Sequence, residues 1–317
     1  MSHTLNLLRK HNNYTRLLLF MSSILFLTTL SFSAFSQEDL LAALKSEVTP
    51  DPGYVFSTFK STRIINSHSV ETISKGNLDF RISHRFGRLN SGAYNFFGLD
   101  EATIRLALEY GIHDRLTVGI GRSSFQKTMD GYLKAKLARQ RKSEGKSFPI
   151  SVTWFSNMAY NALRNGDEVI DNNSRYRFSY AHQLIIARKF SSDLSLQVAP
   201  VLIHNNLKES SDKSNDLYAI EFGGRIKVSK RVSINADYIY RLTSNENGPY
   251  YNSLSLGVDI ETGSHVFQLH FTNSQGMIEE MFVTRTTGKW SNGDIFYGFN
   301  ISRQFVLRNK GQKYETN

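Results

Sequence analysis

The stretch LDFRISHRF, residues 78–86, carries the pattern that decides the fold. Apart from His84, one parity is apolar, with Leu78, Phe80, Ile82 and Phe86. The opposite parity is polar, with Asp79, Arg81, Ser83 and Arg85. Because successive side chains of a β-strand point to opposite faces of the sheet, this stretch predicts a strand with one apolar and one polar face.

The same alternation recurs in eleven further segments, which makes twelve along the chain. They fall within residues 103–110, 116–121, 133–137, 150–154, 175–180, 194–199, 218–227, 234–241, 254–261, 267–271 and 295–302. A soluble β-sandwich alternates in the same way, with its apolar face inside. The periodicity therefore predicts an all-β protein and leaves two architectures open.

Segment length and tyrosine positions favour a transmembrane antiparallel β-barrel over the sandwich. The segments run to about 9 to 12 residues, as a tilted strand needs to cross a bilayer, whereas sandwich strands usually have about 5 to 6. Tyrosines gather at the ends of the apolar faces, as expected of aromatic girdles at the membrane interfaces. These are Tyr110, Tyr176, Tyr180, Tyr240 and Tyr297.

The connections predict twelve strands with both ends of the barrel in the periplasm. Short links near residues 111–114, 191–193, 229–231 and 262–264 alternate with longer ones, as periplasmic turns alternate with outer loops. Residues 57–66 also look strand-like, and we interpret them as a periplasmic or lumen-plugging segment. The alternative is a fourteen-strand barrel in which this segment pairs with residues 281–286.

The ends of the chain suggest export. Basic residues Arg9, Lys10 and Arg16 precede an apolar run at 17–30, which predicts a signal peptide at residues 1–36. We expect an N-terminal periplasmic or plug segment at 37–76, the barrel at 77–305 and a polar tail at 306–317. The chain has no cysteine, which excludes disulfides, zinc thiolate sites and cysteine nucleophiles.

The inward parity of the predicted strands is rich in charge. Eleven basic residues share it with six acidic ones, so we expect an electropositive lumen that favours anionic solutes or, alternatively, ion pairs that pack the lumen shut. The candidate lumen-lining residues are Arg81, Arg85, Arg105, Glu109, Lys134, Lys136, Arg175, Arg177, Glu221, Arg225, Lys227, Asp237, Arg241 and Asp259. The full chain carries a formal charge of +10, about +7 without the signal peptide.

Motifs for chemistry are weak. A barrel phospholipase would need a His and a Ser on neighbouring positions of one face, and no His-x-Ser occurs. The adjacent pair His113-Asp114 falls in a predicted periplasmic turn, and the other histidines are scattered singly. We therefore predict no catalytic site, no metal site and no cofactor.

Several stretches resemble the β-barrel family known as domain of unknown function 5777. They are residues 78–87, 96–100, 114–127, 151–155 and 293–305, and the resemblance extends from about 59 to 305. It implies an outer-membrane barrel of a Gram-negative envelope and brings no activity, substrate or catalytic residue with it. One departure is the polar tail after Phe305, where many such barrels end on an aromatic residue.

The sequence thus suggests a passive or gated conduit, or binding site, for small polar or anionic solutes. The main alternative is a non-conducting scaffold whose loops at 161–174 and 273–294 contact a partner. A lipid-modifying barrel enzyme is a weaker alternative. We expect a monomer that contacts outer-membrane lipid, needs the barrel-assembly machinery for insertion and binds no nucleic acid.

Overall fold

The computed structural model describes residues 53–307 except 143–146, 165, 168–170, 208–213, 244–248 and 264. The predicted signal peptide at 1–36 and nearly all of the polar tail lie outside the described residues. In the described part, no helix is long and apolar enough to cross a membrane.

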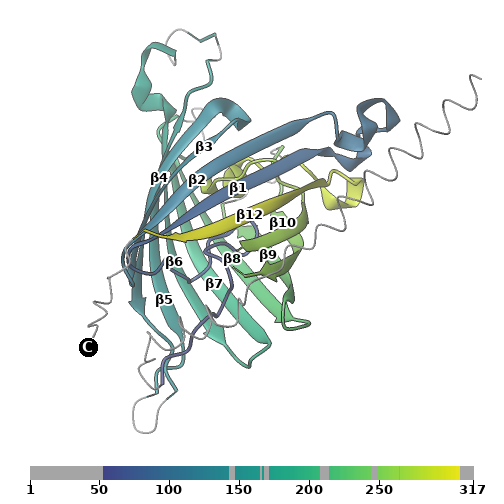
Figure 1. The fold of residues 1–317 in the computed structure, drawn as a ribbon. Helices are drawn as coiled ribbons and strands as arrows, with labels where there is room; N and C mark the ends of the chain where they lie inside the picture. Colours follow the sequence, from purple (N-terminus) through teal and green to yellow (C-terminus); the bar gives the residue numbers. More distant parts are fainter. Residues whose placement is uncertain are drawn as a thin grey trace, which may run out of the picture. The chain divides into compact units, whose positions relative to one another are not determined.

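Twelve antiparallel strands close into a barrel within the described residues, as predicted (Figure 1). The first half comprises β1 (Asn77–Arg88), β2 (Ala102–His113), β3 (Leu116–Ser123), β4 (Thr128–Ala138), β5 (Ser151–Asn161) and β6 (Phe178–Lys189). The second comprises β7 (Leu194–Asn205), β8 (Asp216–Lys227), β9 (Val232–Arg241), β10 (Ser253–Thr262), β11 (His265–Thr272) and β12 (Phe296–Val306). Figure 1 shows β1 beside β12, and their register places Ile82 opposite Ile301.

In the part of the chain that the structure describes, helical elements lie in the connections between strands. They are the 3-10 helices η1 (Leu89–Ser91), η2 (Ala93–Gly98), η3 (Phe125–Lys127), η4 (Ser174–Arg177) and η5 (Trp290–Asn292), and the α-helix α4 (Glu279–Thr284). The chain enters β1 and leaves β12 at the end where β2–β3, β6–β7, β8–β9 and β10–β11 are joined by short turns. This is the end predicted to face the periplasm, so we call it the periplasmic end and the opposite end the extracellular end.

Burial alternates along the strands with the period that the sequence predicts. In β1 the polar residues Asp79, Arg81, Ser83 and Arg85 are buried inside the barrel. Large apolar residues such as Ile120, Leu196 and Leu269 lie exposed on the outside, where lipid would cover them.

The fourteen-strand alternative is wrong. Residues 57–73 enter the lumen and fold back instead of joining the wall, and residues 279–284 form α4, which is also buried inside the barrel. Neither segment is a member of the strand ladder. The strand-like pattern at 57–66 reflects burial of its apolar side chains against the inner wall.

Candidate functional site: the filled lumen

We call residues 57–73 the plug segment. Its middle folds back as a tight hairpin, in which the Ile64 N–H donates to the Ser67 carbonyl (2.8 Å) and the Ser69 N–H donates to the Thr62 carbonyl (2.9 Å). The hairpin is buried throughout residues 61–70. The plug segment therefore rises from the periplasmic end into the lumen, turns, and returns to β1.

The tip of the hairpin is held by one carboxylate on β9. Oδ2 of Asp237 accepts backbone hydrogen bonds from Ile65 (3.2 Å), Asn66 (2.8 Å) and Ser67 (3.1 Å). Three successive N–H groups around an anionic oxygen form an anion-binding nest, and hydrogen bonds to a charged acceptor are stronger than neutral ones. Asp237 thus fixes the height of the plug tip in the barrel.

A charged cluster on the opposite wall holds the rising arm of the hairpin. Nη2 of Arg81 donates to Ser61 Oγ (2.6 Å) and Thr62 Oγ1 (2.9 Å), and Nζ of Lys134 donates to the Thr62 carbonyl (3.0 Å). Arg81 also lies 3.6 Å from Glu109. Two of the cations predicted to line a pore, Arg81 and Lys134, therefore bind the plug segment.

Shape complementarity adds to these polar contacts. The δ-methyl of Ile64 sits against Gly223 of β8, where a Cβ atom would collide with it. Ile64 also belongs to an apolar cluster with Phe59 and Val70 of the plug segment and Phe155 and other residues of the inner wall. Glycine at 223 thus lets the Ile64 side chain approach the wall closely.

The β11–β12 loop, residues 273–295, fills the extracellular side of the lumen. Its helix α4 packs Phe282 and Val283 against inward residues of β6 to β9. Glu279 of α4 reaches the plug segment, with Oε1 lying 3.2 Å from Arg63 and 3.4 Å from His68. Its other oxygen accepts from Asn157 of β5 (2.9 Å). The plug segment and the loop therefore meet inside the barrel.

Most of the predicted lumen-lining residues do face the lumen. The buried ones are Arg81, Arg85, Arg105, Glu109, Lys134, Arg177, Glu221, Arg225, Asp237 and Asp259. Arg85 donates to Asn66 of the plug tip, Arg225 contacts Glu261 at 3.5 Å, and Lys136 contacts Glu71 of the plug segment at 3.1 Å. Arg177 bonds loop carbonyls at the outer mouth.

Three other predicted lumen-lining residues are not fully buried in the lumen. Arg175 is exposed on η4, because the strand that the alternation extends back to 175 begins only at Phe178. Lys227 and Arg241 are only partly buried because they lie at the ends of β8 and β9.

The expected cationic surplus is absent from the buried charges. Among the described buried residues, seven basic side chains accompany eight acidic ones. The cations are Arg63, Arg81, Arg85, Arg105, Lys134, Arg177 and Arg225. The acidic residues are Asp79, Glu109, Asp130, Glu221, Asp237, Asp259, Glu279 and Glu280. The predicted cationic surplus is therefore not found among the fully buried side chains.

The surplus of cations was predicted because the alternation did not reveal some of the charged residues in the lumen. Asp130 forms a bidentate pair with Arg105 (2.5 and 3.1 Å), but the apolar parity of β4 is too short in the sequence to assign it inward. Arg63, Glu279 and Glu280 lie outside the strands, so no periodicity could place them. Of these three, only Arg63 lay in a segment predicted to be strand-like, residues 57–66, whereas Glu279 and Glu280 precede the segment 281–286.

One Ser–His contact occurs on the lipid-facing surface. Ser156 Oγ lies 3.0 Å from His182 Nδ1 across β5 and β6, a cross-strand pairing that a search for His-x-Ser cannot find. Both residues lie midway along their strands, away from water, where a mutual hydrogen bond satisfies two polar groups in lipid. In the described residues, no group of three or more His, Asp and Glu side chains is arranged to hold a metal.

A closed strand ladder with apolar residues outside and buried charges inside defines this protein as a membrane-bound β-barrel. It belongs to the family described as membrane bound beta barrel domain (DUF5777), whose model matches residues 59–305. The resemblance in the sequence is thus confirmed. No curated protein sequence matches the chain.

Solved structures show similar barrels at very low sequence identity. The NanC porin has a TM-score of 0.46 at 8% identity, with 71% of this chain and 98% of that chain covered. The KdgM porin has a TM-score of 0.42 at 10% identity, with coverages of 72% and 99%. The outer membrane phospholipase A of Escherichia coli has a TM-score of 0.43 at 12% identity, with coverages of 71% and 92%. These likenesses concern the barrel fold.

Proposed function

We propose that this protein is a gated conduit of the outer membrane for small polar solutes, and that the structure describes its closed state. The observation that carries the proposal is that the wall is complete without the two segments that fill it. All twelve strands of the described part pair with one another, and neither the plug segment nor α4 takes part in the ladder. Either segment can therefore leave without opening the barrel wall.

The space that the plug segment and the β11–β12 loop occupy in the lumen supports a pathway wide enough for a small solute. Barrels of eight strands are filled by their own side chains, whereas sixteen-strand porins leave an aqueous channel. This twelve-strand barrel holds a complete hairpin and a helical loop in addition to its inward side chains. Displacement of one segment would leave space for water and a small solute.

The charges of the wall favour polar over specifically anionic solutes. Without Arg63, Glu279 and Glu280, which belong to the filling segments, the buried described wall residues comprise six cations and six anions. Charged rings of one sign would be required for strong selectivity. We therefore expect a reversal potential close to zero in a salt gradient.

The test compares two neighbouring glycines in planar bilayers. Gly223→Leu fills the space of the Ile64 methyl and should displace the plug segment, whereas the outward Gly224 has only a Leu196 methyl at 3.4 Å from an added Cβ. We expect the wild type and Gly224→Leu to stay mainly closed and Gly223→Leu to conduct. An insulating Gly223→Leu barrel whose residues 57–73 have become accessible to protease would contradict conduction.

The second candidate is a non-conducting barrel. It is favoured by the two apolar clusters inside the lumen, around Phe59 and Phe155 and around Phe282 and Ile203. Burial of each large apolar side chain stabilises by roughly 1.5 to 3 kcal/mol, which suits permanent packing. In this case a partner would contact the exposed part of the β11–β12 loop, such as Lys289 and Ser291, because residues 277–284 are buried in the lumen.

A further inference from the structure

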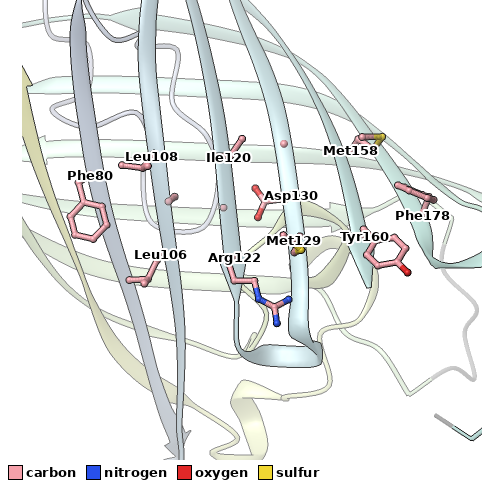
Figure 2. Close-up of a pocket in the computed structure, with 13 residues that line it drawn as sticks. Phe80, Leu106, Leu108, Ile120, Arg122, Met129, Asp130, Met158, Tyr160 and Phe178 are labelled. Atoms are coloured by element: carbon pink, nitrogen blue, oxygen red, sulfur yellow. The ribbon is translucent and has the colours of Figure 1, made fainter. Parts of the chain in front are cut away.

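A groove of about 550 Å³ lies on the lipid-facing side of the barrel, over β1 to β5 (Figure 2). The side chains that form its walls are apolar and come from successive strands: Phe80, Leu106, Leu108, Ile120, Met129 and Met158. Tyr160 and Phe178 close one side. Its volume falls within the range of about 300 to 1,000 Å³ that is typical of small-molecule sites.

The groove exists because one outward position has no side chain. Gly131 of β4 is paired with Ile120 of β3, and its neighbours Met129 and Leu133 on the same face are both exposed. A Cβ atom at Gly131 would have the Gly119 carbonyl oxygen at 3.9 Å as its nearest contact. The space above Gly131 is therefore free of protein and is bordered by flexible methionine side chains, which adapt readily to an apolar occupant.

The extracellular end of the groove carries a cation. Arg122 is exposed at the outer end of β3, and Figure 2 shows it beside the turn that leads to β4. Its Nη1 donates to the carbonyl of Lys127, which is itself exposed in that turn. An arginine on a lipid-facing surface is stable where its guanidinium reaches the polar headgroup layer. The groove thus joins an apolar trough to a basic end.

We propose that this groove binds lipid A, the acylated and phosphorylated glycolipid of the outer leaflet. One acyl chain lies over Gly131 between Ile120, Met129 and Met158, and a phosphate pairs with Arg122. The groove matches this lipid in charge and in depth, because its basic end lies at the extracellular side, where an outer-leaflet headgroup would be. The inference rests on the outer-membrane location in the proposed function and is independent of conduction.

Two substitutions test the two halves of the site in the full-length barrel. Gly131→Leu fills the trough without a backbone clash, and Arg122→Gln removes the charge. The matched controls are Gly224→Leu on the lipid face of β8 and Arg188→Gln, whose guanidinium stacks on Phe190 at the periplasmic end of β6. Heat-modified mobility on gels confirms that each barrel is folded.

Binding of lipid A to the delipidated barrel in detergent is measured by native mass spectrometry. We expect each substitution to weaken binding by about tenfold. Gly131→Leu should remove contacts with about two methylene groups of the acyl chain. Arg122→Gln should remove one exposed ion pair with a phosphate. The controls should match the wild type, and dephosphorylated lipid A should bind the wild type about as weakly as lipid A binds Arg122→Gln.

Three outcomes would overturn the proposal. They are unchanged binding by Gly131→Leu, equal losses in Gly224→Leu, and binding of phosphatidylglycerol as tight as that of lipid A. Bilayer conductance of the same variants is a separate measurement. Failure of lipid binding is therefore distinguishable from failure of the conduit.

Discussion

Nη1 of Arg63 lies 3.2 Å from Oε1 of Glu279, and this ion pair joins the plug segment to the β11–β12 loop in the interior of the barrel. Both side chains are almost completely buried. Removal of one partner from a buried pair costs about 3 to 5 kcal/mol, because the remaining charge is uncompensated. The two segments should therefore respond together when this contact is broken.

Glu279→Ala should weaken the closed state by about 3 kcal/mol, which corresponds to roughly a hundredfold increase in the ratio of open to closed barrels. Open probability in planar bilayers measures the effect. The double variant Arg63→Ala/Glu279→Ala should show less than the sum of the single effects, since it leaves no unpaired partner. Exposed Glu101→Ala is the control, and additive single effects would argue against the pair.

Asp237→Asn should loosen the plug tip while leaving the wall intact. The amide cannot supply the anionic oxygen that Ile65, Asn66 and Ser67 share. Loss of about 2 kcal/mol predicts roughly thirtyfold faster hydrogen exchange at these three amides. Asp216→Asn, at the outer end of β8 beside His204, should leave their exchange unchanged. Equal acceleration in both variants would indicate general destabilisation.

Closure should depend on pH through Glu280. Burial raises the pKa of Glu280 from its usual 4.5 to about 7, with Asp130 and Glu279 adding to the effect and Ser179 and Arg285 opposing it. The raised pKa means that the protonated form is favoured inside the barrel. The contribution of protonated Glu280 to the stability of the closed state is complete below about pH 4.5 and is lost as the pH rises through 7.

We therefore expect the open probability to be higher at pH 8 than at pH 5. Glu280→Gln should remain closed at both values, because it resembles the protonated acid and does not ionise. A wild-type barrel with the same open probability at pH 5 and pH 8, or a Glu280→Gln barrel that keeps the pH dependence, would show that this carboxyl does not control the loop.

The Arg105–Asp130 pair should contribute to the stability of the barrel wall rather than to the stability of the closed state. It spans β2 and β4 across Gly121 of β3, where a Cβ atom would collide with the guanidinium. Asp130→Ala should destabilise the folded barrel by about 3 to 5 kcal/mol by leaving Arg105 buried and unpaired. Urea unfolding in detergent measures this loss, and Arg105→Leu/Asp130→Leu should recover much of it. If the double variant does not recover stability, side-chain packing rather than the unpaired charge causes the loss.

Much of the wall could be predicted because the relevant signal is local. A strand whose two faces meet lipid and lumen must alternate, so Leu78, Phe80 and Ile82 already indicate the orientation of β1. Alternating short and long connections then predicted twelve strands with both ends on one side, which the barrel confirms. The exception, Arg175, shows that alternation does not mark where a strand begins.

The interior could not be predicted in this way. The positions of Asn66, Ile64 and Glu279 depend on partners on distant strands, such as Asp237 and Gly223, and no local period encodes those contacts. The count of inward charges was likewise incomplete without Asp130 and the filling segments.

For this protein, the sequence by itself determined a membrane barrel of twelve strands, since alternation is imposed on each strand separately by the media on its two sides. Only the tertiary structure decided that residues 78–86 turn their arginines toward a plug rather than toward an open pore. The physical reason is that the filling of a lumen depends on contacts between segments far apart in the chain, which form only once the barrel is closed.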